Sequence, residues 1–436
     1  MATRAAPFND WLARGFAAVA ARTGRGPPAG PTPRLCLVLG NEGGDMDSCV
    51  CALYGALLLQ ALHDAAAAPV QCVPVLNFAK DDLPLRGDVD ALFRAHGVDQ
   101  DALVHCPTHV DLSLPPADAL PAGDVAADAT LFLVDHNRLG APQRCWDDRV
   151  VGVVDHHADE GHYPADADAT RVALGTAVAP IRVVVTPVGS AATLLTQTWR
   201  AVAGEVPLPL PALLRSPIVM DTTNFTDKNK TTPLDIEQGG WLETQSGETR
   251  AALDAAFAGL KAAKYDTSRL TVPQQLRRDY KHFALPYGAD GASTLSVGVA
   301  AWVEPRAVAF ERHGAAGLAA EGGAYCRAHR PPLDALVIMF ASETPDGATV
   351  RQVSFLGPEG GAATGPALAL AEGFTSADGP TYRQAEGKAA PCDFTDRSVD
   401  AGGVSFEQAD GTVSRKQFTP LLSKWVKLAF ARSPPA

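Results

Sequence analysis

The first half of the chain alternates short runs of β-branched and aliphatic residues with longer segments rich in alanine and leucine. This alternation is typical of βαβ units and predicts an α/β fold built on a parallel sheet. The expected strands lie at residues 34–40, 70–76, 102–105, 130–134, 150–154, 182–185 and 218–220. The expected helices lie at residues 48–62, 89–96 and 190–203.

The second half has a different pattern, and the change falls near residues 239–264, an alanine-rich helical stretch that could link two domains. Beyond it, strands are expected near 295–302, 336–341 and 349–355, and a helix around 420–430. The Gly- and Ala-rich segment 357–373 is expected to be a mobile loop. Residues 1–33 are expected to be a frayed helix and linker, with a weak transit signal as the alternative. The predicted parts are therefore an N-terminal extension (1–33), a first domain (34–240), a linker helix (241–264) and a second domain (265–436).

Aspartates stand where three of the expected strands end, at Asp135, Asp155 and Asp221. Two more, Asp45 and Asp47, follow the first strand in "GNEGGDMDS". Open α/β sheets bind ligands at the carboxyl ends of their strands, so these acids are expected to converge at one edge. Each signal is weak by itself, because an aspartate before a helix is more often an N-cap than a ligand. Their conjunction within one domain's length predicts a metal site.

The segments "VDHN" (134–137), "DHH" (155–157) and "DTTNF" (221–225) combine these carboxylates with imidazoles. This ligand set suits Mn²⁺ or Mg²⁺, whereas thiolates would suit zinc or iron–sulfur sites. A carboxylate that bridges two cations about 3.5–4 Å apart makes a two-metal site that hydrolyses phosphoryl groups. One or two cations per site are therefore expected.

The net charge of −12 disfavours nucleic acid or an anionic membrane as a partner, so a local cluster of cations must attract any anionic ligand. No apolar run is expected to reach transmembrane length. The eight cysteines include no C-x-x-C pair, and Cys36, Cys49 and Cys51 lie in apolar runs, as buried free thiols would. These features favour a reducing compartment, and a cytoplasmic location is expected, with an organelle as the alternative. They leave the oligomeric state open.

In this order, the four polar segments resemble the motifs of the DHH phosphoesterase superfamily. In the second half, "YDTSRLTVPQQLRRDYKHF" (265–283) and "SRKQFTPLL" (414–422) resemble the DHHA2 domain of family II inorganic pyrophosphatases, eukaryotic exopolyphosphatases and prune-like proteins. The resemblance covers residues 34–430. It implies a larger parallel-sheet DHH domain, a smaller α/β DHHA2 domain, and an active site in the cleft between them.

Carried over residue by residue, the resemblance implies that Asp45 ligates one metal and Asp47 the other. Asp135 would bridge both metals, and His156 and Asp221 would complete the second site. These five side chains form the expected metal-binding set.

The resemblance also implies a set of groups that contact the substrate. His157 would contact the phosphate that is attacked, together with Arg415 and Lys416 of "SRK", a pair of cations suited to a polyanion. Without the resemblance, the two basic residues would be interpreted as a solvated charge pair. The family's other substrate-binding lysine has no identified counterpart in "GADGASTLSVGVA". Lys230, with Lys228, could supply charge from the first domain, and a solvated loop is the alternative.

Asn41 distinguishes between branches of the family. In the pyrophosphatases a histidine stands four residues before the first aspartate, and Asn41 occupies that position here. Its amide oxygen is a weaker ligand than imidazole, which should shift the metal preference from Mn²⁺ or Co²⁺ toward Mg²⁺. The "GNE" opening resembles the exopolyphosphatase and prune branch. His157 stands where animal prune-like proteins tend to carry arginine, which favours an exopolyphosphatase.

The resemblance therefore implies a metal-dependent exopolyphosphatase that releases orthophosphate from the ends of inorganic polyphosphate. One alternative is the hydrolysis of pyrophosphate, short polyphosphates or nucleotide phosphodiesters. Another is a prune-like regulatory binding protein, against which the intact acids and "DHH" argue. A related nuclease is disfavoured because the sequence has no "GGGH" motif.

Overall fold

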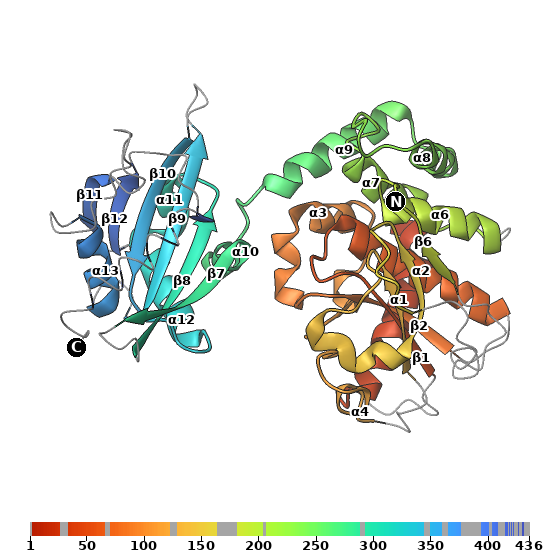
Figure 1. The fold of residues 1–436 in the computed structure, drawn as a ribbon. Coiled ribbons are helices and arrows are strands. Elements are labelled where there is room, and N and C mark those ends of the chain that lie inside the picture. Colours follow the sequence, from red (N-terminus) through yellow and green to blue (C-terminus); the bar gives the residue numbers. More distant parts are fainter. Residues whose placement is uncertain are drawn as a thin grey trace. The chain divides into compact units, whose positions relative to one another are not determined.

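The structure is a computed structural model. It describes residues 2–26, 34–65, 70–122, 129–163, 181–203, 206–287, 293–343, 349–359, 365–375, 394–400 and 403–408, with single positions between 415 and 430. The chain divides into two compact units, Met1–Asp266 (unit 1) and Thr267–Ala436 (unit 2), and each is described by itself (Figure 1).

Unit 1 contains a six-stranded sheet in which all neighbouring strands are parallel. Its strands are β1 (Arg34–Leu39), β2 (Val70–Leu76), β3 (Val104–His105), β4 (Ala129–Val134), β5 (Val150–Asp155) and β6 (Arg182–Val184). They are ordered β3-β2-β1-β4-β5-β6. The predicted α/β fold with a parallel sheet is confirmed.

Helices surround this sheet (Figure 1). The α-helices of unit 1 are α1 (Ala2–Arg22), α2 (Met46–Ala65), α3 (Gly87–Ala95), α4 (Pro116–Ala119), α6 (Ala191–Val202), α7 (Pro211–Asp221), α8 (Pro233–Ser246) and α9 (Arg250–Tyr265). Short 3-10 segments lie at Lys80–Leu85, Gln100–Ala102 and Ala141–Arg149.

Side chains of β1 alternate between two buried layers, as expected for a sheet covered on both faces. Leu35, Leu37 and Leu39 join one hydrophobic cluster, whereas Cys36 and Val38 join the other. The second cluster also contains the buried faces of α2, α6 and α7. These helices are therefore held against one face of the sheet.

Helix α2 is long and apolar enough to span a membrane by length and composition, contrary to the expectation from the sequence. However, 78% of its most apolar window is buried inside unit 1. This burial is the pattern of a core helix, because α2 packs against β1 and β2 of the sheet and against α6 and α7.

The strand order reverses between β1 and β4, which are neighbours in the sheet. Chain connections leave this point in opposite directions, so the carboxyl ends of the two strands border a crevice where open α/β sheets bind ligands. The loop that carries Asp45 and Asp47 follows β1, and Asp135 directly follows β4. The topology therefore brings the first two motifs together.

Three predictions for unit 1 are wrong. The helix of the N-terminal extension, expected to be frayed, is α1, whose Phe8, Trp11 and Leu12 are buried in a hydrophobic cluster of unit 1. Residues 218–220, predicted as a strand, belong to α7, so Asp221 ends a helix. This short apolar run lies on a helix that packs against α2, α6 and α8, and a buried helix has no polar face that would distinguish it from a strand. The stretch 239–264, predicted as one helical segment, is also divided. Helix α8 ends at Ser246 and is capped by Gly247, whose φ of 65° suits glycine, and α9 begins at Arg250.

Unit 2 contains a six-stranded mixed sheet ordered β11-β12-β10-β9-β8-β7, in which β8 and β9 are parallel and the other pairs antiparallel. Its strands are β7 (Tyr280–Tyr287), β8 (Ser293–Trp302), β9 (Ala335–Glu343), β10 (Thr349–Leu356), β11 (Phe394–Asp400) and β12 (Gly403–Gln408). Its helices are α10 (Val272–Arg278), α11 (Arg306–His313), α12 (Ala315–Ala328) and α13 (Gly365–Thr375).

The strands predicted near 295–302, 336–341 and 349–355 are confirmed as β8, β9 and β10. The predicted loop 357–373 is wrong in its second half, where α13 buries Ala367, Leu370 and Ala371 in a hydrophobic cluster. The predicted helix 420–430 lies largely outside the described residues. Its described positions include Leu422, Val426 and Phe430, which are buried in the same hydrophobic cluster. Phe418, just before it, is buried there as well.

Candidate metal centre

The loop between β1 and α2 is shaped by a glycine at its tip. Gly44 has a φ of 57°, and a Cβ there would lie 2.3 Å from the Phe78 ring and 2.8 Å from Arg86 Nε. Arg86 Nε donates to the Gly44 carbonyl at 2.7 Å, and its Nη2 donates to the Gly43 carbonyl at 2.8 Å. The loop is therefore held by an arginine that contacts its backbone directly.

Asp45 follows this tip and caps α2. Its Oδ1 accepts a hydrogen bond from the Ser48 backbone N–H at 3.0 Å. The N-cap interpretation of this residue therefore holds, and it is compatible with metal binding because the bond uses one carboxylate oxygen.

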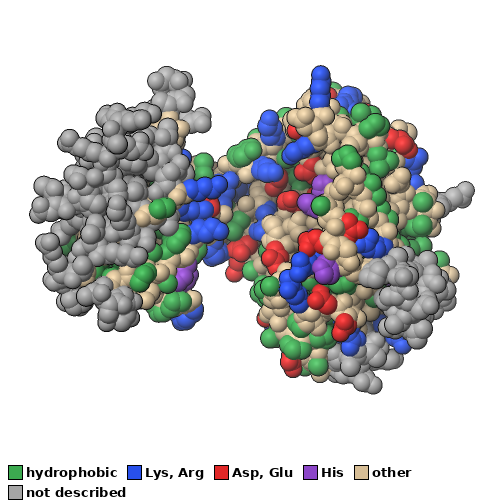
Figure 2. Space-filling model, in the orientation of Figure 1, with side chains coloured by type: hydrophobic (Ala, Val, Ile, Leu, Met, Phe, Trp, Pro, Cys, Tyr) green, Lys and Arg blue, Asp and Glu red, His purple; other side chains and the backbone are tan. Residues whose placement is uncertain are grey.

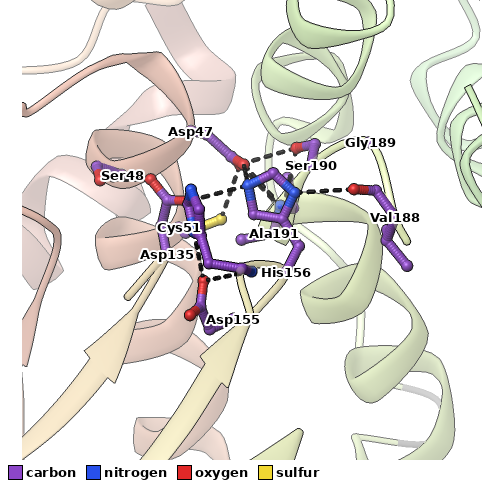
Figure 3. Close-up of polar contacts among 12 residues, drawn as sticks. Asp47, Ser48, Cys51, Asp135, Asp155, His156, Val188, Gly189, Ser190 and Ala191 are labelled. Atoms are coloured by element: carbon purple, nitrogen blue, oxygen red, sulfur yellow. Dashed lines mark hydrogen bonds and ion pairs between the residues drawn. The ribbon is translucent and has the colours of Figure 1, made fainter. Parts of the chain in front are cut away.

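Asp47, in the first turn of α2, is buried and points at the N-terminus of α6 (Figure 3). Its Oδ1 accepts from Ser190 Oγ at 2.8 Å and from the Ala192 N–H at 3.0 Å, and its Oδ2 accepts from the Ala191 N–H at 2.6 Å. A helix N-terminus stabilises a carboxylate, because its first N–H groups have no partner within the helix. This arrangement fixes the direction of Asp47.

Asp135 directly follows β4 and has a φ of 61°, in the left-handed region that residues with a Cβ seldom occupy. Its Oδ2 accepts from Ser48 Oγ at 2.6 Å and from Asn41 Nδ2 at 2.8 Å. The orientation of the Asn41 amide follows from its partners, since its Oδ1 accepts from the Gly44 N–H at 3.1 Å. Asn41 therefore faces Asp135 as a donor, and not with the oxygen that the sequence suggested as a metal ligand.

His156 and His157 follow β5, and His157 Nδ1 lies 3.7 Å from Asp135 Oδ1. His156 also approaches Asp135 (Figure 3). His156 Nδ1 donates to the Val188 carbonyl at 2.9 Å, which leaves Nε2 as the atom that faces Asp135 Oδ1 at 3.3 Å. Ligand atoms of Asp135, His156 and His157 all lie within 4.8 Å of one another. A carbonyl that fixes the tautomer in this way is a common feature of metal-binding histidines.

His157 is oriented by the first residue of "DHH". Its Nδ1 donates to Asp155 Oδ1 at 2.8 Å, and this hydrogen bond raises the pKa of His157. Asp155 is fully buried, and its Oδ2 accepts from Asn137 Nδ2 at 2.6 Å. Burial acts to raise the pKa of Asp155, but the bonds from His157 and Asn137 hold it below its ordinary value.

Asp221 stands at the C-terminus of α7, where the helix dipole opposes a negative charge. Burial and the charges of Asp47 and Asp45 raise the pKa of Asp221 to about 9. Burial and the charge of Asp135 raise the pKa of Asp47 to about 7. The carboxylates are close enough to disfavour one another's ionisation, so a cation would stabilise the ionised cluster.

The ionisation of His156 supports the same conclusion. Burial acts to lower its pKa, but the hydrogen bond to Asp135 and the charge of Asp47 raise the pKa to about 10. Without a metal, the His156 imidazolium is therefore a positive charge inside this cluster. Oxygen-rich donors with one or two imidazoles fit a hard divalent cation.

The structure thus brings Asp45, Asp47, Asp135, His156, His157 and Asp221 to one edge of the sheet. On the same unit, acidic and histidine side chains gather on the visible face (Figure 2). Lys230 is exposed, and no contact of its ammonium group with the cluster is seen among the described residues.

Arg415 and Lys416 belong to unit 2. Arg415 donates to both the backbone carbonyl and the carboxylate of Asp279, whereas Lys416 is exposed. The expected cleft between the domains, and the joining of these cations with the acids, stay predictions.

Several residues that shape the site do not stand out in the sequence. Asp155 belongs to "DHH" but has no role among the expected ligands, although a carboxylate two residues before a histidine can orient it. Ser48 and Ser190 carry only the weak signal of a small polar residue next to a helix start.

Comparison with known proteins identifies the family. A model of the DHHA2 domain matches residues 258–425, most of unit 2. Human exopolyphosphatase PRUNE1 (Homo sapiens) is 30% identical over 399 residues, which span 91% of this chain and 76% of that protein. The chain belongs to the prune-related branch of the DHH/DHHA2 phosphoesterases. It therefore has the family's DHHA2 domain as well as a parallel-sheet domain with an Asp–His cluster.

Other relatives match this chain over a smaller share of their own length than the human protein does. Bovine exopolyphosphatase PRUNE1 (Bos taurus) is 31% identical over 325 residues, 74% of this chain and 63% of that protein. A putative exopolyphosphatase of Schizosaccharomyces pombe is 26% identical over 263 residues, 58% of this chain and 61% of that protein. Membership of the branch and the Asp–His group together indicate a hydrolase that depends on a divalent metal.

Proposed function

We propose that this chain is a metal-dependent exopolyphosphatase that releases orthophosphate from the ends of inorganic polyphosphate. The observation that carries the proposal is the convergence of Asp47, Asp135 and His156 at the sheet's switch point. The chain that carries them is similar, over 91% of its length, to a human protein named exopolyphosphatase. The comparisons do not favour the alternatives of a short-chain hydrolase or a regulatory binding protein.

The proposed cations are Mg²⁺ or Mn²⁺, one or two per site. Asp45, Asp47, Asp135, His156 and Asp221 are the residues that would hold them. The fit rests on the raised pKa values of Asp47 and Asp221, about 7 and about 9, which are those of an uncompensated acidic cluster. When bound, the cations would neutralise phosphoryl charge and acidify a water. Asn41 contacts Asp135 as a donor, so its proposed influence on metal preference acts through that carboxylate.

His157 is the proposed contact to the phosphate that is attacked. Its Nδ1 is engaged with buried Asp155, so Nε2 is the nitrogen available for a ligand, and the side chain is 57% exposed. A positively charged imidazole would stabilise charge on a phosphoryl oxygen and could donate a proton to the departing phosphate. Asp155 maintains both the orientation and the basicity that these roles require.

Arg415 and Lys416 are proposed to bind the polyanion from unit 2, where basic side chains gather on the visible face (Figure 2). Asp279 anchors the Arg415 guanidinium through its carbonyl and carboxylate. A guanidinium held in this way has little freedom to lose when it meets a phosphate, and it is well shaped for bidentate contact. Lys230 is proposed as an additional cation from unit 1.

A reducing location such as the cytoplasm is proposed on the basis of the thiols. Cys36, Cys49 and Cys51 are buried and free, as expected from the sequence. Buried free thiols suit a compartment in which disulfides do not form.

The experiment measures phosphate release from long-chain polyphosphate, tripolyphosphate and pyrophosphate by protein stripped with EDTA and reloaded with Mg²⁺ or Mn²⁺. Metal-restored release from the long chains is expected. Asp135→Asn should abolish turnover with an unchanged circular dichroism spectrum. Asp118→Asn, at an exposed position of α4, should leave turnover unchanged. Absence of metal-dependent turnover on all three substrates would overturn the enzyme proposal, and a strong preference for pyrophosphate would reassign the substrate.

A further inference from the structure

The residues directly after Asp221 adopt a backbone conformation that their side chains oppose. Thr223, Asn224 and Phe225 have φ values of 51°, 52° and 64°. Residues with a Cβ enter this left-handed region at an energetic penalty, and normally as single residues. Three in succession make a left-handed turn at the end of α7. Such strain persists where the surroundings hold it, and it is concentrated at functional sites.

Hydrogen bonds hold the turn from two sides. The Asn224 backbone N–H donates to the Val219 carbonyl of α7 at 2.6 Å. The Asn224 side chain donates from Nδ2 to Asp254 Oδ1 of α9 at 2.9 Å. Arg250, also on α9, lies 3.2 Å from the same Asp254 oxygen. The turn is thus bonded both to the helix that carries Asp221 and to a helix that follows later in the chain.

The Phe225 ring is seated on a glycine of α8. A Cβ at Gly239 would lie 2.5 Å from Phe225 Cζ, closer than real carbon atoms approach. The guanidinium carbon of buried Arg215 lies 5.7 Å from the centre of the ring. The ring also packs against the main hydrophobic cluster of unit 1. Glycine at position 239 therefore leaves the space that the ring occupies.

The turn also contacts the loop that orients the other ligands. A Cβ at Gly189 would lie 2.7 Å from Thr222 Cγ2, so the methyl group of Thr222 packs directly on this glycine. Gly189 lies between Val188, whose carbonyl accepts from His156, and Ser190, whose hydroxyl donates to Asp47. A displacement of the turn would therefore reach the same cluster of ligands.

We propose that the left-handed turn at residues 223–225, seated on Gly239 through Phe225, sets the position of the Asp221 carboxylate for cation binding. Asn224 and Phe225 are positioning residues, because their contacts with Asp254 and Gly239 hold the strained turn directly after Asp221. The inference rests on the proposed function, since it treats Asp221 as a metal ligand.

The chain offers a matched pair of variants on one helix. Gly239→Ala places a methyl group against the Phe225 ring, whereas the next residue, Gly240, has nothing within 4 Å of the added Cβ. Alanine for glycine usually stabilises a helix, so Gly240→Ala should be folded with unchanged metal affinity. Gly239→Ala should weaken Mn²⁺ binding by about tenfold or more, as expected when a supporting residue of a metal site is disturbed. Calorimetric titration of Mn²⁺ into this chain, after its metal has been removed, measures the affinity of both variants.

Two further variants keep the test decisive if Gly239→Ala unfolds. Asn224→Gly retains a residue that tolerates positive φ but removes the bond to Asp254, and it should also weaken Mn²⁺ binding. Phe225→Leu combined with Gly239→Ala relieves the clash and should restore part of the affinity. Equal Mn²⁺ affinity in wild type, Gly239→Ala and Asn224→Gly would overturn the inference. If the wild type itself binds no Mn²⁺, the proposed function fails first.

Discussion

Asp47, at the start of α2, accepts a hydrogen bond from the backbone N–H of Ala191, the first residue of α6, at 2.6 Å. One predicted metal ligand therefore joins two helices that are far apart in the sequence. Among the described residues, the Asp45 carboxylate, two residues earlier, has a hydrogen bond only to the start of its own helix. The two aspartates of the first motif thus differ in what they contribute to the metal-free fold.

This difference predicts unequal stability of two variants. Asp47→Ala removes the acceptor of three bonds to α6 and should reduce the free energy of unfolding by about 1–3 kcal/mol. Asp45→Ala removes an N-cap, and its cost should be about 1 kcal/mol or less. Both changes remove a charge from the cluster, so the difference between them reports the helix contacts. Urea denaturation in EDTA measures it, and an equal or larger loss for Asp45→Ala would contradict the assignment.

Metal binding should release protons. In the metal-free protein, the pKa values of Asp47, Asp221 and His156 are about 7, 9 and 10, so near pH 7 the last two hold a proton that a bound cation displaces. Raising the pH lowers the concentration of protons that compete with the cation, so the apparent affinity for Mg²⁺ or Mn²⁺ should increase between pH 6 and 8. Calorimetry in two buffers with different ionisation enthalpies measures the protons released. A value of zero at pH 7 would contradict the prediction.

Asp155→Asn should separate the orientation of His157 from metal binding. The amide cannot stabilise a positive imidazole as a carboxylate does, so kcat should fall by about tenfold or more. Metal affinity should change little, because Asp155 contacts His157 and Asn137. Asp159→Asn is the matched control, since Asp159 pairs with Arg182 at the surface. The prediction is wrong if kcat for phosphate release is the same in both variants.

Arg86→Lys should loosen the loop that carries Asp45. The guanidinium donates to the carbonyls of Gly43 and Gly44 and lies 3.7 Å over the Phe78 ring, a geometry that a single ammonium group cannot reproduce. Metal affinity should fall by about tenfold. Arg94→Lys, which alters an exposed pair with Asp90, should leave the affinity unchanged. Unchanged affinity in Arg86→Lys would show that the loop keeps its shape without this contact.

Most of the sheet in unit 1 is predictable from the sequence, because strands buried on both faces appear there as uninterrupted apolar runs. The same physics explains the error at residues 218–220, since α7 is also buried and "SPIVM" has no polar face. The prediction of a loop over α13 fails for a related reason, because its alanines resemble a flexible linker unless their burial is known.

The sequence by itself determined the chemical types at the site. Carboxylates after buried strands, together with "DHH", are a pattern that a parallel sheet brings to one edge, and the resemblance to the DHH family then implies the roles expected of Asp45, Asp47, Asp135, His156 and His157. Only the tertiary structure decided how each group is held. Ser190 and Asp47 are 143 residues apart, and Asn41 and Asp135 are 94 apart. Hydrogen bonds between such distant residues depend on packing that no local pattern encodes. For the same reason, the left-handed turn after Asp221 is visible only in the fold.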